Sequence, residues 1–145
     1  MWQRRFGDPA KVTETVLVID ASTAVDLCLA PDGFATLHEE DLIAPPLILS
    51  EVLSVLHEMR WRGDVPEEMA KLGVERHRQM PVRIMEPGEL RAEAWRIADE
   101  FGWAKTYDAE YVALAKLNGC CLVTTDARLR RGADRLGFVI TPADL

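Results

Sequence analysis

The chain has 145 residues, of which 48% are hydrophobic and 28% charged, and a formal net charge of −7 at pH 7. This length is typical of one domain with a conventional core, and the absence of an 18-residue apolar run excludes a transmembrane helix. The negative charge argues against a general polyanion binder, because affinity for phosphates comes from clustered Lys and Arg.

The first part of the chain predicts an arm followed by a strand-turn-helix unit. Residues 1–15 show no hydrophobic periodicity and no apolar stretch of a signal peptide, so we expect a loose N-terminal arm ahead of a single domain at 16–145. The β-branched and leucine run at 16–19 predicts a buried strand that ends at Asp20. A short helix is expected at 21–29, and a brief second strand at 42–44.

The middle of the chain is dominated by helical periodicity. After Pro45-Pro46, apolar residues at positions 49, 52, 53, 56 and 59 follow the i, i+3, i+4 spacing of a helix at 47–62. A further helix is expected from Pro66 to about Met80. The next segments predict a strand at 82–86 and an amphipathic helix at 89–101.

The stretch TYDAEYVALAKLNGCCLVTTDARL, residues 106–129, predicts a helix followed by a buried strand at 120–125. Thr106 is a candidate N-cap, and Asn118-Gly119 is a typical helix end. About 11 helical residues carry the chain ~16 Å in one direction, and about 5 to 6 strand residues bring it back by nearly the same amount. Asp108 and Asp126 are therefore expected at the same level. A helix at 127–136 and a strand at 137–141 complete the chain.

The alternation of strands and helices predicts an α/β fold with a mostly parallel, five-stranded sheet and helices on both faces. In such sheets ligands bind beyond the carboxyl ends of the strands. Asp20 and Asp126 both follow predicted strands directly. This edge of the sheet is the candidate site.

Each acidic residue also has a purely structural interpretation. Asp20 and Asp126 could cap the helices that follow them, and Asp108 is favoured in a first turn by the helix dipole. Glu51 is harder to explain in this way, because it lies within the apolar sequence LILSEVLSVL and needs a partner or a cation there. Four acids that converge on one rim would repel one another and would favour an oxygen-ligated hard cation, Mg²⁺ or Mn²⁺.

Metal-assisted hydrolysis of a phosphodiester is the chemistry that such a site favours. The three histidines lack the spacing of zinc ligands, and no phosphate-binding, dinucleotide-binding or esterase motif is present. The three cysteines have no CxxC spacing and suit buried positions in a reducing compartment, so we expect a cytoplasmic protein. A metal-dependent phosphatase or exonuclease at the same rim stays open.

Four motifs together give the chain its resemblance to a known family: VIDAS, PPLILSEVLSVL, TYDAEYVALA and LVTTD. From about Val16 to Thr141 it resembles a PIN-domain ribonuclease of the VapC toxin type. The resemblance implies a three-layer α/β/α sandwich and metal-dependent cleavage of single-stranded or loop RNA. It also implies a cytoplasmic toxin, usually a homodimer, that a small VapB-like antitoxin neutralises. The site residues that it implies are Asp20, Glu51, Asp108 and Asp126 as catalytic ligands of Mg²⁺ or Mn²⁺, supported by Ser22 and Thr125.

Two departures from the family pattern are visible. Ser54 stands where many relatives have an asparagine three residues after the motif glutamate, and about fifteen residues precede the first motif. This arm is expected to be disordered, to contact a partner, or to reflect an upstream start.

Other residues suggest contacts with RNA or protein. Positive charge near the acids is expected from Arg128, Arg130 and Arg131, as phosphate contacts or as a solvated helix face. Trp61 and Trp103 are candidates for partner contact or for packing. The alternative function is a catalytically weak PIN-like interaction module that acts through a protein partner. The four acids favour the nuclease, because a binding module has no use for a repelling cluster.

Overall fold

The computed structural model describes residues 15–145, so the predicted arm lies almost wholly outside the described residues. Five strands form one sheet in the order β3-β2-β1-β4-β5, and all four strand pairs are parallel. This confirms the predicted sheet. The strands are β1 (Val16–Ile19), β2 (Asp41–Ala44), β3 (Val82–Ile84), β4 (Cys121–Val123) and β5 (Val139–Ile140).

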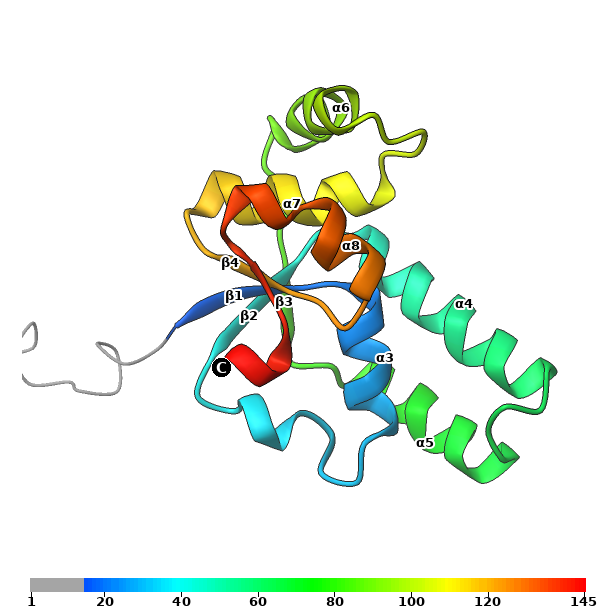
Figure 1. Cartoon of the computed structure of the whole chain (residues 1–145). Coiled ribbons are helices and arrows are strands. Elements are labelled where there is room, and N and C mark those ends of the chain that lie inside the picture. The colour runs from blue at the N-terminus through cyan, green and yellow to red at the C-terminus, as the bar shows by residue number, and fades with distance from the viewer. Residues whose placement is uncertain (1–14) are drawn as a thin grey trace, which may run out of the picture.

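Helices cover both faces of the sheet and confirm the three-layer α/β/α fold. Figure 1 shows α7 lying against one face with α6 outside it, and α3, α4 and α5 grouped on the other side. Within the described part of the chain, no helix combines the length and apolarity needed to cross a membrane. The α-helices are α3 (Ala21–Leu29), α4 (Leu47–Trp61), α5 (Glu67–Arg78), α6 (Leu90–Phe101), α7 (Tyr107–Asn118) and α8 (Ala127–Gly132).

The prediction of one continuous helix at 127–136 is wrong. Helix α8 ends at Gly132, and a separate 3₁₀ turn, η2 (Asp134–Leu136), follows. The backbone leaves helical geometry at Ala133, directly after a glycine that stabilises a helix poorly. Two further 3₁₀ turns, η1 (Gly33–Leu37) and η3 (Pro142–Asp144), are too short to produce a periodic signal in the sequence.

Helix α7 lies in the core and fixes the position of its own N-terminus. Its residues 111–115 are buried without interruption, because the helix packs on β1 and β4 on one side and on α6 on the other. This double contact explains why the sequence of α7 is apolar all round instead of amphipathic. Asp108 lies in the first turn of this rigid helix.

The carboxyl ends of β1 and β4 meet at one edge of the sheet. Ile19 pairs with Val123, and the Asp20 amide donates to the Val123 carbonyl at 3.3 Å. The residues that follow these two strands are therefore close in space although more than 100 positions apart in the sequence. Asp20 and Asp126 therefore follow adjacent strands at the same edge of the sheet, as the sequence predicts.

Arg76 of α5 anchors the loop that follows α3, and its removal is expected to destabilise the fold. Its guanidinium donates to the carbonyl of Cys28 at 3.1 Å, to that of Pro31 at 2.9 Å, and to that of Ala30. Arg76→Ala leaves these carbonyls without their charged donor and should lower the free energy of unfolding by about 2 kcal/mol in urea titration. Arg78→Ala is the control, because Arg78 is exposed and should cost less than about 0.5 kcal/mol. Equal effects of the two substitutions would contradict the anchoring role.

Glu93 of α6 links this helix to α7 and should make stability depend on acid pH. It accepts hydrogen bonds from Arg96 and from Lys116 of α7, and these bonds lower its pKa from 4.5 to about 2. The ion pairs of Glu93 with Arg96 and Lys116 therefore stabilise the fold above pH 4.5, and this contribution is lost as the pH falls towards 2. Glu93→Gln should cost up to about 1 kcal/mol at neutral pH, and the difference from wild type should shrink in that acid window. A pH-independent difference in urea midpoints would argue against the ionic link.

Candidate metal and active site

The four predicted acids line one cavity of about 470 Å³ at the carboxyl edge of the sheet. They come from four separate places in the chain: the end of β1, helix α4, the first turn of α7 and the residue before α8. All four predicted acids thus line the same cavity. The cavity is lined by Asp20, Glu51, Asp108 and Asp126, and by Ala21, Ser22, Val25, Asp26, Val55, Met59, Arg62, Asp64, Tyr111 and Arg128.

Asp20 is the most buried of the four acids, with 4% of its surface exposed. One carboxylate oxygen accepts from the Thr23 amide at 3.0 Å and from the Ser22 hydroxyl at 2.8 Å, and the other accepts from the Thr124 hydroxyl. Burial raises the pKa of Asp20, and these hydrogen bonds oppose the rise. Asp20 is also the N-cap of α3, as its structural interpretation predicts, and the same side chain lines the cavity of the acids.

In the last motif, LVTTD, the threonine whose hydroxyl donates to Asp20 is Thr124, which the sequence analysis missed. Thr124 is fully buried and also accepts from the Asp126 amide at 3.0 Å, so it joins the two acids. Thr125, the predicted supporting residue, is exposed and donates its amide to Ser22 at 3.3 Å. Thr124 could have been identified from the sequence as a hydroxyl at the buried end of an apolar strand, because such a group needs a polar partner.

Glu51 is held by Tyr111 of α7, a second residue that the sequence analysis missed. The phenol donates to a Glu51 carboxylate oxygen at 2.6 Å, and Tyr111 is 1% exposed. Burial raises the pKa of Glu51, the Tyr111 hydrogen bond lowers it, and the charges of Asp108 and Asp20 raise it further. Tyr111 lies three residues after Asp108 and therefore on the same helix face, where a buried phenol requires an acceptor.

Asp108 and Asp126 face one another across Arg128. The guanidinium lies 3.6 Å from the Asp108 carboxylate and 3.8 Å from that of Asp126, and its side chain is 80% exposed. Burial and the charge of Asp126 raise the pKa of Asp108, whereas Arg128 lowers it. Asp126 additionally caps α8 by accepting from the Arg128 amide at 2.9 Å and from the Leu129 amide at 3.3 Å. Both amides donate to Oδ1, whereas Oδ2 is the oxygen nearer the Arg128 guanidinium, so Asp126 also has the capping function that the sequence predicted.

Four other residues that the sequence singles out do not line the cavity of the acids. Arg130 pairs with Asp134 at 2.5 Å, and neither Arg130 nor Arg131 lines the cavity of the acids. Trp61 is 81% exposed at the end of α4. Ser54 lines the groove between α4 and α5 and not the cavity of the acids, and the hydrogen bond to Glu51 comes from Tyr111.

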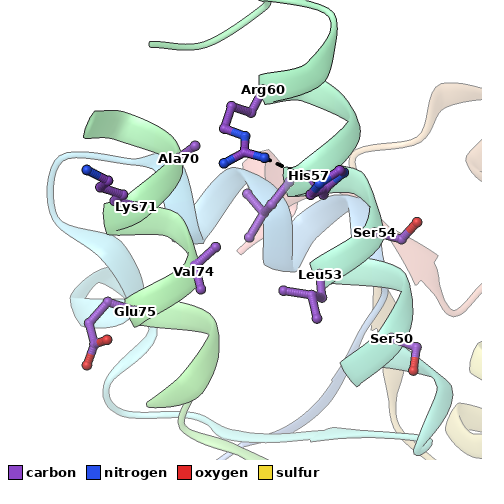
Figure 2. Close-up of a pocket in the computed structure, with 10 residues that line it drawn as sticks. Ser50, Leu53, Ser54, His57, Arg60, Ala70, Lys71, Val74 and Glu75 are labelled. Atoms are coloured by element: carbon purple, nitrogen blue, oxygen red, sulfur yellow. Dashed lines mark hydrogen bonds between the residues drawn. The ribbon is translucent and has the colours of Figure 1, made fainter. Parts of the chain in front are cut away.

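The largest of the three cavities described here is a groove elsewhere, between α4 and α5. It has a volume of about 730 Å³, and Figure 2 shows apolar side chains between the two helices, Leu53 from α4 and Val74 from α5, with polar groups around them. Helix α4 separates this groove from the acids. No predicted site acid lines this groove, so the cavity of about 470 Å³ that the four acids line stays the candidate site. The labelled polar residues are Ser50, Ser54, His57, Arg60, Lys71 and Glu75.

The donor chemistry of the acidic cavity fits a hard divalent cation. Its candidate ligands are carboxylate and hydroxyl oxygens, and burial together with mutual repulsion raises the pKa of Asp108 and Glu51. Within residues 15–145, however, no three acidic, histidine or cysteine side chains are already close enough to hold a metal ion together.

Comparison with known proteins identifies the family. The PIN-domain family model matches residues 17–135. Ribonuclease VapC3 of Mycobacterium tuberculosis is 36% identical over 86% of this chain and 92% of its own length, and the VapC ribonuclease Mb0985 of Mycobacterium bovis is 33% identical over 79% and 88%. The crystal structure of PAE2754 from Pyrobaculum aerophilum has the same fold, with a TM-score of 0.70 and 24% identity over 90% of this chain and 85% of its own. The chain therefore belongs to the PIN-domain family, in its VapC group.

Proposed function

We propose that this chain is a metal-dependent endoribonuclease, the toxin of a type II toxin–antitoxin pair, which hydrolyses single-stranded or loop RNA. The observation that carries the proposal is the convergence of Asp20, Glu51, Asp108 and Asp126 on one cavity. The names of the relatives, ribonucleases of the VapC group, support the same activity. A hydrolase acting on RNA phosphodiesters accounts for both.

The four acids are the groups that would hold Mg²⁺ or Mn²⁺. Such an ion supplies a water of lowered pKa and neutralises charge on the phosphate. Asp20 is oriented for this task by three hydrogen bonds, and Glu51 by the Tyr111 phenol. Arg128 stands at the mouth of the site, where its exposed guanidinium can contact an RNA phosphate.

The biological setting is part of the proposal. A small VapB-like antitoxin is the expected partner, because the relatives belong to the VapC group. We also propose a homodimer that acts in the cytoplasm. The described cysteines, Cys28, Cys120 and Cys121, are all free thiols, which suits a reducing compartment.

A divalent cation should stabilise the folded protein. Only the folded state assembles the carboxylates, so millimolar Mn²⁺ should raise the melting temperature of wild type. Asp108→Asn should diminish this gain, and it should raise the melting temperature without metal, because it removes a charge that burial and Asp126 both disfavour. Asp99→Asn, an exposed position on α6, is the control and should keep the full response. A melting temperature that does not change with Mn²⁺ in any of the three proteins would contradict the metal site.

Cleavage should depend on the acids and leave characteristic ends. Asp126→Asn retains a residue type that caps helices well, so it should keep α8 while lowering the cleavage rate by at least ~100-fold. Attack by a metal-activated water requires no ribose hydroxyl, so the products should carry 5′-phosphate and 3′-hydroxyl. A single 2′-deoxynucleotide at the mapped cut should still be cleaved. The measurement is end-mapping of a mixed RNA pool incubated with and without Mn²⁺.

Each opposite outcome has a definite meaning. A 2′,3′-cyclic phosphate, or full protection by the deoxynucleotide, would make the ribose hydroxyl the nucleophile and overturn the mechanism. Undiminished cleavage by Asp126→Asn would place the activity elsewhere. No cleavage by well-folded wild type free of its antitoxin would favour the interaction module, a function that requires no bound metal ion.

A further inference from the structure

A second cavity of about 610 Å³ adjoins the acids. Glu51, Asp108 and Arg128 line both cavities, so the two share a wall at the proposed catalytic centre. Its volume falls within the range of sites that bind small molecules. The rest of its lining is Gly102, Trp103, Ala104, Lys105, Tyr107, Leu129 and Gly132, from the loop between α6 and α7 and from α7 and α8.

Two aromatic side chains line this second cavity. Trp103 is held in place by Phe101, with ring centroids 5.1 Å apart and planes at 34°, and Phe101 is covered by the Arg135 guanidinium at 4.0 Å from its ring centre. Tyr107 is 56% exposed although it is aromatic and adjoins Asp108 in sequence. A fixed indole and an exposed phenol beside a nuclease site form a surface on which a planar base can stack.

Positive charge is present at the same place. Lys105 and Arg128 both line the cavity, in a chain whose net charge is −7. An acidic protein that acts on RNA needs local cations, because phosphate contacts provide most of the affinity for nucleic acid. The combination of aromatic rings and cations is typical of sites that bind unpaired nucleotides.

We propose that this cavity binds the base of an unpaired nucleotide next to the scissile phosphate. Trp103 and Tyr107 provide the stacking surface, and Lys105 contacts a neighbouring phosphate. This inference rests on the proposed function, since it places the RNA relative to the acids. Trp103 and Tyr107 are positioning residues, and they restrict the substrate to single-stranded RNA because a paired base cannot enter the cavity.

Equilibrium binding of short single-stranded RNAs tests the inference without any cleavage. Fluorescence anisotropy is measured in EDTA, with RNAs that each carry one abasic nucleotide at a different position along the strand. Wild type should bind about 10-fold more weakly when the stacked base is missing, and Trp103→Ala or Tyr107→Ala should lose a similar factor on intact RNA. At that one position the losses from the variant and from the abasic site should not add, because both remove the same contact.

Substitution of glycines gives an independent test that leaves the aromatic residues in place. A side-chain carbon at Gly132 would lie 3.7 Å from the Trp103 indole, so Gly132→Leu extends into the cavity. This variant should weaken RNA binding about 10-fold while it keeps the Mn²⁺-induced rise in melting temperature. Gly88→Leu is the matched control, because a side-chain carbon at Gly88 meets no atom within 4 Å, and its RNA affinity should equal that of wild type.

The outcomes separate this inference from the proposed function. Wild-type cleavage together with unchanged RNA affinity in Tyr107→Ala and Gly132→Leu would overturn the base site and leave the nuclease intact. Fully additive losses at every abasic position would also overturn it. Non-additive losses at one position in a protein that cleaves no RNA would support the cavity and contradict the nuclease. Unchanged RNA affinity with loss of antitoxin binding would assign the cavity to the protein partner instead.

Discussion

The pairing of β1 with β4 is the constraint on which the site depends. Both strands lie in the middle of a parallel sheet, so their carboxyl ends meet at one edge and bring Asp20 next to Thr124 and Asp126. The Thr124 hydroxyl then connects the two acids, since it donates to Asp20 and accepts from the Asp126 amide. A shift of β4 by one residue would turn Thr124 to the other face and separate the acids.

The fold also holds carboxylates where their charge is unfavourable. Burial raises the pKa of Asp20, Glu51 and Asp108, and repulsion from neighbouring acids adds to it for Glu51 and Asp108. Because their folded-state pKa lies above the unfolded value, these groups stabilise the metal-free protein most at acid pH, and the contribution is lost as the pH rises through the folded-state pKa. A site that costs stability at neutral pH is consistent with a function that requires a cation.

Helix α7 links the hydrophobic core to the cavity of the acids. Its buried residues fix the helix between the sheet and α6, while its first turn presents Tyr107 to the second cavity and Asp108 to both. Tyr111, one turn further on, supports Glu51 from α4. A single rigid helix thus sets the spacing between the acids and the proposed base site, which is the geometric condition for cutting next to a bound nucleotide.

The sequence by itself determined the five parallel strands, the layer of helices on each face and the four acids, because periodicity and strand ends are local properties of the chain. It did not determine that Thr124 rather than Thr125 contacts Asp20, that Tyr111 holds Glu51, or that the segment at 127–136 is split after Gly132. It also did not show the second cavity, although Trp103 was a candidate for partner contact or for packing. These features depend on the register between β1 and β4 and on the side-chain contacts of α7 with α4 and α8, Tyr111 with Glu51 and Asp108 with Arg128. Only the tertiary structure decides them, because hydrogen bonds between residues 60 to 104 positions apart leave no local pattern in the chain.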